Sequence, residues 1–205
     1  MSNPITGPIL LPSKPALKAD SPFMLDWGGA LTPQNGGAVQ TLMRLGTRNG
    51  LDFTLPQMRT EPLGREWSAK LRLAKLFGAL LPFGQDGFNI GTPGTPVIDG
   101  AGQSGMVAAM RGFTPGYVVK LGQAFSLVHL NRRYLHFAAV TAIVDTGGRI
   151  SLPIFPMLRL FPNDGDACEF ATPMIQGSLS GNQVKWNRQS APWTDVGTIT
   201  ITEDE

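Results

Sequence analysis

The sequence predicts a mainly β protein, in which antiparallel strands form a barrel or sandwich and one α-helix is present. The chain of 205 residues contains 25 glycines and 17 prolines, so turns are frequent, and 42% of its residues are apolar, which is enough for a folded core. Short segments with alternating apolar residues recur along the chain, whereas helical spacing occurs in a single segment. Strands that follow one another without intervening helices pair antiparallel.

The charge and cysteine content limit the possible partners and cofactors. The net charge of +2 does not indicate a polyanion partner, but residues 1–163 carry +7 and residues 164–205 carry −5. The acidic end would complement a basic surface on the same chain or on a neighbouring copy. A single cysteine, Cys168, excludes an internal disulfide and a multi-cysteine metal site. We expect no signal peptide and no transmembrane span, because the N-terminus lacks a basic region and the apolar runs are short.

The first expected element is a proline-rich extended arm over residues 1–20. Proline fixes the backbone and lacks an amide donor, so an extended conformation is favoured. The arm has little core of its own, and its apolar residues favour packing across another surface: Ile5, Ile9, Leu10, Leu11 and Leu17. Three strands are expected next, over residues 23–27, 38–45 and 51–55. Asn49-Gly50 separates the last two and is typical of a tight hairpin turn.

Helical spacing extends from Thr60 to Leu81. Thr60 can cap the helix, and Trp67 and Leu71 recur on one face. We expect one amphipathic helix that ends before Pro82. A turn-rich stretch over residues 91–105 then marks the expected domain boundary. Further strands are expected over residues 106–110, 117–119, 124–130, 134–144, 149–155, 167–170, 184–186 and 198–202.

The turn-rich stretch contains Gly100-Ala-Gly102-Gln-Ser-Gly105, which matches the GxGxxG pattern of dinucleotide sites. Such a site needs a strand before it, a helix after it and an acidic residue about twenty positions later. The sequence supplies none of these. A flexible turn is therefore the better interpretation.

The residue types that carry catalysis or bind metals are few. His129 and His136 would point to opposite faces of one strand, which disfavours a shared metal. Cys168 lies among acidic residues, which would raise its thiol pKa, so we expect a structural role. Three carboxylates could serve as calcium ligands or in a hydrolase, but their spacing fits a hairpin turn with solvated charges better: Asp164, Asp166 and Glu169. We assign no catalytic, cofactor-binding or metal site.

Basic residues without acidic neighbours occupy the segment from Ala101 to Val144. They are Arg111, Lys120, Arg132 and Arg133, and both histidines lie in the same segment. A small barrel with a basic, aromatic face is one way to bind single-stranded nucleic acid or glycans. A β-barrel binding module for glycan or nucleic acid is therefore the alternative function. A protein interface that meets an acidic neighbour is the better interpretation of this patch.

Several segments follow one another in a characteristic order. They are FMLDW, GGAVQTL, an alternating strand, a tryptophan-bearing helix before PFGQDGF, and then GTPGTPVIDGAGQSG, GFTPG, KLGQAFSLV and VTAIVDTGGRISLPIFPMLR. Over residues 20–202 this order resembles distal tail or minor tail proteins of the tail tip of tailed bacteriophages, most specifically from Pro93 to Arg159. Gln123 departs from the pattern, because an acidic residue is expected after the glycine. The resemblance therefore does not establish the turn that precedes this barrel strand.

The resemblance implies a ring-forming split-barrel domain with one helix over residues 21–91 and 165–205, and a small β-barrel inserted over residues 92–164. It implies a non-enzymatic virion protein without cofactors, made in the bacterial host cytoplasm. The expected partners are further copies in a ring, expected as a hexamer, the tail tube and the tail-tip or hub proteins. No membrane and no specific nucleic acid are expected.

The resemblance also implies that the arm reaches an adjacent subunit. The apolar arm residues would form this interface, and the opposite charges of the two chain segments also favour contacts between copies. Deleting residues 2–19 is then expected to weaken assembly and to leave the fold intact.

Overall fold

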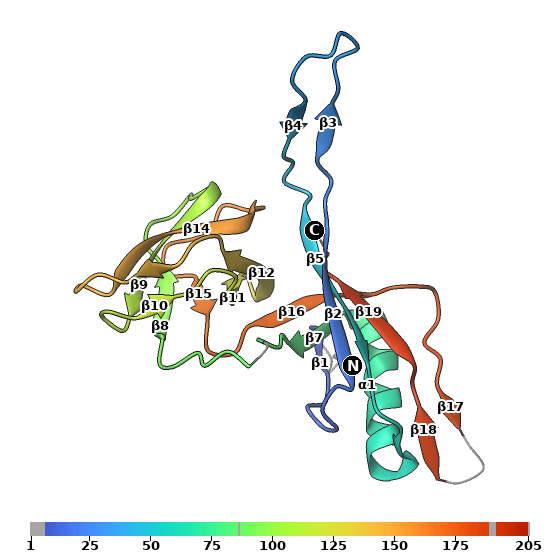
Figure 1. The fold of residues 1–205 in the computed structure, drawn as a ribbon. Coiled ribbons are helices and arrows are strands. Elements are labelled where there is room, and N and C mark those ends of the chain that lie inside the picture. The colour runs from blue at the N-terminus through green and yellow to red at the C-terminus, as the bar shows by residue number, and fades with distance from the viewer. Residues whose placement is uncertain (1–6, 86, 189–191, 205) are drawn as a thin grey trace, which may run out of the picture. The chain divides into compact units, whose positions relative to one another are not determined.

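The computed structural model is mainly β and confirms the predicted class. It describes residues 7–85, 87–188 and 192–204. This part of the chain contains one α-helix, a six-stranded sheet and a closed six-stranded β-barrel (Figure 1). It falls into two compact units. The sheet unit comprises the chain up to Phe23, Asn49–Pro82 and Ile175–Asp204, and the barrel unit comprises Met24–Arg48 and Phe83–Met174.

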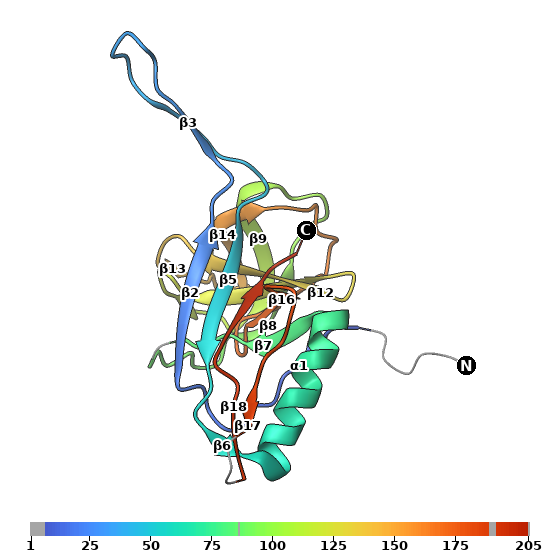
Figure 2. The ribbon, with the colours of Figure 1, turned by 90° about the vertical axis from the view of Figure 1, so that its right-hand side faces the viewer.

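The sheet unit is built on the six-stranded sheet. Its strand order is β1 (Ile9–Leu10), β7 (Ala79–Pro82), β16 (Met174–Leu179), β19 (Thr198–Thr202), β5 (Arg48–Thr54) and β2 (Ala19–Leu25). A smaller sheet joins β17 (Asn187–Arg188), β18 (Trp193–Asp195) and β6 (Met58–Arg59). Helix α1 (Arg65–Phe77) packs against β1 and β7 (Figure 2).

Helix α1 is held to the sheet by its apolar face. Trp67, Leu71 and Ala74 are buried, and the Trp67 ring lies 6.3 Å from the ring of Phe53 in β5. The Trp67 indole Nε1 donates a hydrogen bond of 2.8 Å to the main-chain oxygen of Lys14. Burial of these side chains stabilises the unit by removing apolar surface from water.

The predicted bounds of the helix, residues 60–81, are wrong at both ends. The helix begins at Arg65, after an irregular turn over Thr60–Gly64. It ends at Phe77 because Gly78 adopts a φ of 85°, which glycine tolerates and other residues avoid. The residues that follow form the largely buried strand β7 instead of a last helical turn.

The tight turn predicted at Asn49-Gly50 is also wrong, because both residues lie within strand β5. A Cβ added at Gly50 would lie 2.2 Å from the ring of Phe23, so this ring covers the glycine. The main-chain amide of Asn49 donates a hydrogen bond to the Glu203 carboxylate (2.9 Å), and the main-chain amide of Glu203 donates one to the main-chain carbonyl of Asn49 (3.0 Å). Tertiary pairing therefore overrides the local preference for a turn.

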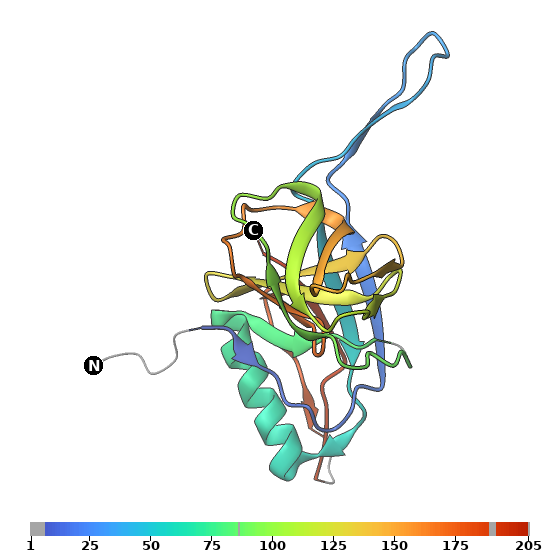
Figure 3. The same cartoon turned by 90° about the vertical axis from the view of Figure 1, so that its left-hand side faces the viewer.

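The barrel unit closes on itself (Figure 3). Its strand order is β11 (Ala124–His129), β12 (Arg132–Ala138), β14 (Arg149–Leu158), β9 (Gly105–Phe113), β8 (Gly94–Ile98) and β15 (Ala167–Glu169). Two short pairs accompany it: β10 (Val118–Val119) with β13 (Ala142–Ile143), and β3 (Gly29–Leu31) with β4 (Gln40–Leu42). In the core, Phe125 and Phe170 stack with ring centres 4.6 Å apart, and Phe113 meets Phe170 edge-on at 5.0 Å.

The division of the chain differs from the expected one in three places. Met24–Arg48, expected in the ring domain, group with the barrel unit. Strand β15, expected in the ring domain, completes the barrel by pairing with both β11 and β8. The change of unit falls between Pro82 and Phe83, at the end of β7. The turn-rich stretch over residues 91–105 is not this boundary, because it contains the barrel strand β8.

Replacing Gly177 in β16 with alanine should destabilise the sheet unit by about 3 kcal/mol or more. A Cβ at this position would lie 2.0 Å from the carbonyl oxygen of Thr202 and 2.8 Å from the Cα of Glu203, and these backbone atoms cannot move without breaking the sheet. Urea denaturation followed by circular dichroism measures the loss. Gly29→Ala is the matched control, because nothing lies within 4 Å of a Cβ at Gly29. Equal stability of the two variants would contradict this close approach.

Candidate functional site

Residues 24–48, which we call the hairpin, are held together at their base by side-chain contacts. The Asp26 carboxylate accepts hydrogen bonds from the Gly28 amide (2.7 Å) and from the Thr47 hydroxyl (3.1 Å). The Arg48 guanidinium lies over the Trp27 ring, 5.6 Å from its centre. These contacts hold the segment before β3 next to the segment after β4.

Beyond its base the hairpin has no core. Every residue from 30 to 45 is exposed. Leu31 lies opposite Gln40 and Leu42 lies opposite Gly29, so both leucines are on one face of the two-stranded sheet. The exposed large apolar residues of the hairpin are Met24, Leu25, Trp27, Leu31, Val39, Leu42, Met43 and Leu45.

Between its base residues Asp26 and Arg44, the hairpin carries no charge. No charged residue occurs from Trp27 to Met43, and the side chains of Leu31 and Met43 are 64% and 62% exposed. Exposed apolar residues gathered in a segment without charge are typical of an interaction site. The hairpin is therefore the candidate functional site. The apolar pattern of the sequence predicted strands in this region and did not reveal the exposed surface. The absence of charge from Trp27 to Met43 was the signal that could have identified this surface.

The structure places the arm residues in different environments. Ile5 lies outside the described residues. Ile9 and Leu17 are half-buried and Leu10 is 50% exposed, whereas Leu11 is only 2% exposed. Strand β1 pairs in parallel with β7, and the Leu11 amide donates to a β7 carbonyl (2.9 Å). The expected interface is corrected at Leu11, which belongs to the core of its own sheet unit.

This placement also corrects the expectation for deletion of the arm. Deleting residues 2–19 would remove β1 from the sheet and Leu11 from the core. The deletion would therefore lower the stability of the sheet unit, so it is not a clean test of assembly.

Two of the four basic residues pair with carboxylates inside the barrel unit. Arg111 in β9 lies 3.0 Å from Asp99, and its Nη2 lies 3.1 Å from Asp164. Hydrogen bonding from Arg111 holds the pKa of Asp164 well below its ordinary value. Arg133 in β12 donates two hydrogen bonds, of 2.8 and 2.9 Å, to Glu169 in β15. The structure therefore brings acidic residues to the segment that looked purely basic.

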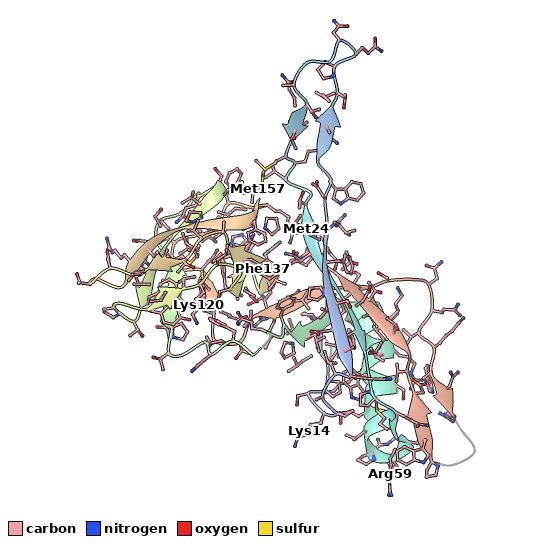
Figure 4. The ribbon with its side chains drawn as sticks, in the orientation of Figure 1. Lys14, Met24, Arg59, Lys120, Phe137 and Met157 are labelled. Atoms are coloured by element: carbon pink, nitrogen blue, oxygen red, sulfur yellow. The ribbon has the colours of Figure 1, made fainter. Side chains whose placement is uncertain are left out.

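The other two basic residues lie against aromatic rings. The Lys120 ammonium, labelled in Figure 4, is 4.7 Å from the centre of the Phe88 ring. The Arg132 guanidinium is 5.6 Å from the centre of the Tyr134 ring. Such cation–π contacts orient a side chain and leave its charge in place.

The carboxylates considered as calcium ligands face basic side chains or a histidine of the barrel. Asp164 faces Arg111, Glu169 faces Arg133, and an Asp166 oxygen lies 2.6 Å from Nδ1 of His129. Among residues 7–85, 87–188 and 192–204, no group of three or more histidine, cysteine, aspartate and glutamate side chains is placed to hold a metal ion.

The GxGxxG match, residues 100–105, lies in the turn between β8 and β9 and is followed by a strand. The Gln103 side chain holds this turn, because its Nε2 donates to the carbonyls of Asp99 (2.9 Å), Gly100 (3.1 Å) and Ala109 (3.0 Å). Its Oε1 accepts from the Ala109 amide (2.7 Å). The predicted turn is confirmed, and the helix that a dinucleotide site requires is replaced by β9.

Two titratable side chains are buried in the barrel unit. His136 in β12 is 1% exposed, its Nδ1 lies 2.9 Å from the Pro156 carbonyl, and burial lowers its pKa to about 4. Burial, with a smaller contribution from Asp166, raises the pKa of the Cys168 thiol. The predicted direction for Cys168 is confirmed, and such a thiol suits a structural role.

A scan of protein-family models finds no match to the chain, and a search of curated proteins finds none either. In the part of the chain that the structure describes, no helix has the length and apolar character needed to cross a bilayer.

Replacing Gln103 with alanine should lower the stability of the protein by about 2 kcal/mol, because main-chain groups of the turn lose their hydrogen-bond partner. Thermal unfolding monitored by circular dichroism measures the change. Ser104→Ala is the neighbouring control, since Ser104 is exposed. A Gln103→Ala variant as stable as this control would show that the turn does not need the side chain.

Stability should also fall as the pH is lowered from 6.5 towards 4, because the unfolded chain protonates His136 near pH 6.5 and the folded barrel only near pH 4. The lower pKa of His136 in the folded state contributes about 3 kcal/mol to the free energy of unfolding. This contribution is fully present above the pKa of the unfolded chain. His136→Gln should flatten this part of the pH profile. Unfolding midpoints of both proteins across the range measure the effect, and parallel profiles would refute it.

Proposed function

We propose that the protein is a non-enzymatic structural component of a tailed-bacteriophage tail tip, a distal or minor tail protein whose copies form a ring between the tail tube and the tip or baseplate proteins. The observation that carries this proposal is the exposed apolar face of the hairpin, in a segment without charge from Trp27 to Met43. The order of segments over residues 20–202 supplies the biological setting, and the hairpin supplies a physical means of assembly.

Covering the hairpin supplies the driving force for association. Burial of apolar surface is favourable by roughly 25 cal/mol per Å² before the cost of association is subtracted. Leu31 and Leu42 lie on one face of the ribbon, so a neighbouring copy would cover both together. The absence of charge from Trp27 to Met43 favours this contact, because burying an unpaired charge opposes association.

The proposed ring requires the hairpin to dock on a different surface of the neighbouring copy, because docking of hairpin on hairpin would give a two-fold dimer instead. Such a head-to-tail contact forms a closed ring when the rotation between copies closes. The sheet unit offers a further surface for contacts between copies, because β2 is the outermost strand of its sheet and Ala19–Pro22 are exposed.

The alternative function, a β-barrel module that binds glycan or nucleic acid, has less support. Arg111 and Arg133 would have to exchange their carboxylate partners for a ligand. A titration with DNA or oligosaccharide at two salt concentrations tests this alternative, since binding of a polyanion must weaken as salt rises.

A charge on the apolar face of the hairpin should prevent assembly. Leu31→Glu and Leu42→Glu should each weaken self-association by about tenfold or more, because a carboxylate would be buried at the contact. Thr41→Glu is the matched control, because Thr41 pairs with Ala30 on the opposite face and is exposed. Gel filtration with light scattering measures the mass, and electron micrographs of negatively stained protein show whether rings form.

Two outcomes would contradict the proposal. One is a wild-type chain that stays monomeric at every concentration. The other is a Leu31→Glu variant that assembles as well as the Thr41→Glu control. Circular dichroism of each variant verifies that both units remain folded, so a loss of assembly is assigned to the hairpin.

A further inference from the structure

The dipeptide Asn-Gly occurs twice in the chain, at residues 35–36 and 49–50, in opposite environments. Asn-Gly is prone to spontaneous deamidation, because glycine has no side chain to hinder its amide nitrogen from reaching the preceding side-chain amide. The reaction needs a mobile backbone and access to water. The two sites therefore form an internal comparison within one molecule.

Asn35 and Gly36 lie in the turn of the hairpin, outside the ladder that joins β3 and β4. Both residues are exposed, Gly36 has a φ of 72°, and no atom lies within 4 Å of the position that a Cβ on it would take. The Gly36 amide donates to the Pro33 carbonyl at 3.3 Å, which is longer than most such bonds. The backbone at this site is thus open to rearrangement.

Asn49 and Gly50 lie in β5, between β19 and β2. Asn49 is 4% exposed, and its main-chain amide and main-chain carbonyl both form hydrogen bonds with Glu203. The ring of Phe23 covers Gly50. Ring closure at this site requires local unfolding of the sheet.

We propose that Asn35 is a site of spontaneous deamidation and that the resulting carboxylate weakens docking of the hairpin. The Gly36 nitrogen loses its proton to solvent base and attacks Cγ of Asn35. The N–Cγ bond forms, the Cγ–Nδ2 bond breaks, and ammonia leaves with a proton from water. Water then opens the five-membered imide at either carbonyl and yields aspartate or isoaspartate. Water is the only co-reactant consumed.

The effect on docking rests on the proposed function. Either product places a negative charge in the turn that joins β3 and β4, and docking is proposed to cover this turn together with Leu31 and Leu42, unlike the opposite face that carries Thr41. Burial of that charge against a neighbouring copy opposes association. A free copy therefore loses its ability to assemble with time, whereas a covered hairpin is shielded from the reaction.

Peptide mapping of the full chain tests the modification. Trypsin places the two sites on separate peptides, residues 19–44 and 49–59. After incubation of folded protein at mildly alkaline pH, mass spectrometry and isoaspartyl methyltransferase labelling should show conversion at Asn35 that is about tenfold or more faster than at Asn49. In concentrated urea both sites should react. Equal rates at the two sites in the folded protein, or no reaction at Asn35, would overturn the proposal.

Two variants test the consequence. Asn35→Asp should self-associate about tenfold more weakly than Asn35→Gln, which keeps a neutral amide of similar shape. Equal association of the two variants would overturn the effect on docking while the peptide result stands. A lack of self-association in all proteins, wild type included, would refute the proposed function and the docking effect together, and the peptide map would still decide whether Asn35 deamidates.

Discussion

A two-stranded ribbon cannot bury its own side chains, and this constraint governs the role of the hairpin. In the sheet unit, α1 covers the sheet and buries Trp67, and in the barrel unit closure of the strands buries Phe125. The hairpin has neither a second layer nor closure, so Leu31 and Leu42 remain in water until another surface covers them. The proposed assembly would satisfy this constraint, and the proposed chemistry at the turn depends on the same lack of cover.

Local patterns predicted the elements that depend on local properties. The mainly β class and the single helix follow from apolar spacing, which the packing of Trp67 and Leu71 preserves. The errors arose where distant residues decide the conformation. Asn49-Gly50 has the composition of a turn, yet pairing with Glu203 and cover by Phe23 keep it extended. No local pattern contains these contacts.

At both candidate interfaces, distant parts of the same chain supply contacts that the local sequence does not contain. The segment with Arg111 and Arg133 contains no acidic residue, but closure of the barrel brings Asp164 and Glu169 to it from a later part of the chain. The arm was expected on a neighbouring copy, and the backbone groups of β1 instead pair with β7 of the same chain. Composition indicates that a segment packs against another surface. It does not show whether that surface belongs to the same chain or to another copy.

The chain leaves the sheet unit after Pro82 and returns at Ile175, and the strands on either side of this excursion, β7 and β16, are neighbours in the sheet. The barrel is thus an insertion between two adjacent strands of the sheet. Recombination at these two points would exchange it for another module while the framework around it keeps its strand order.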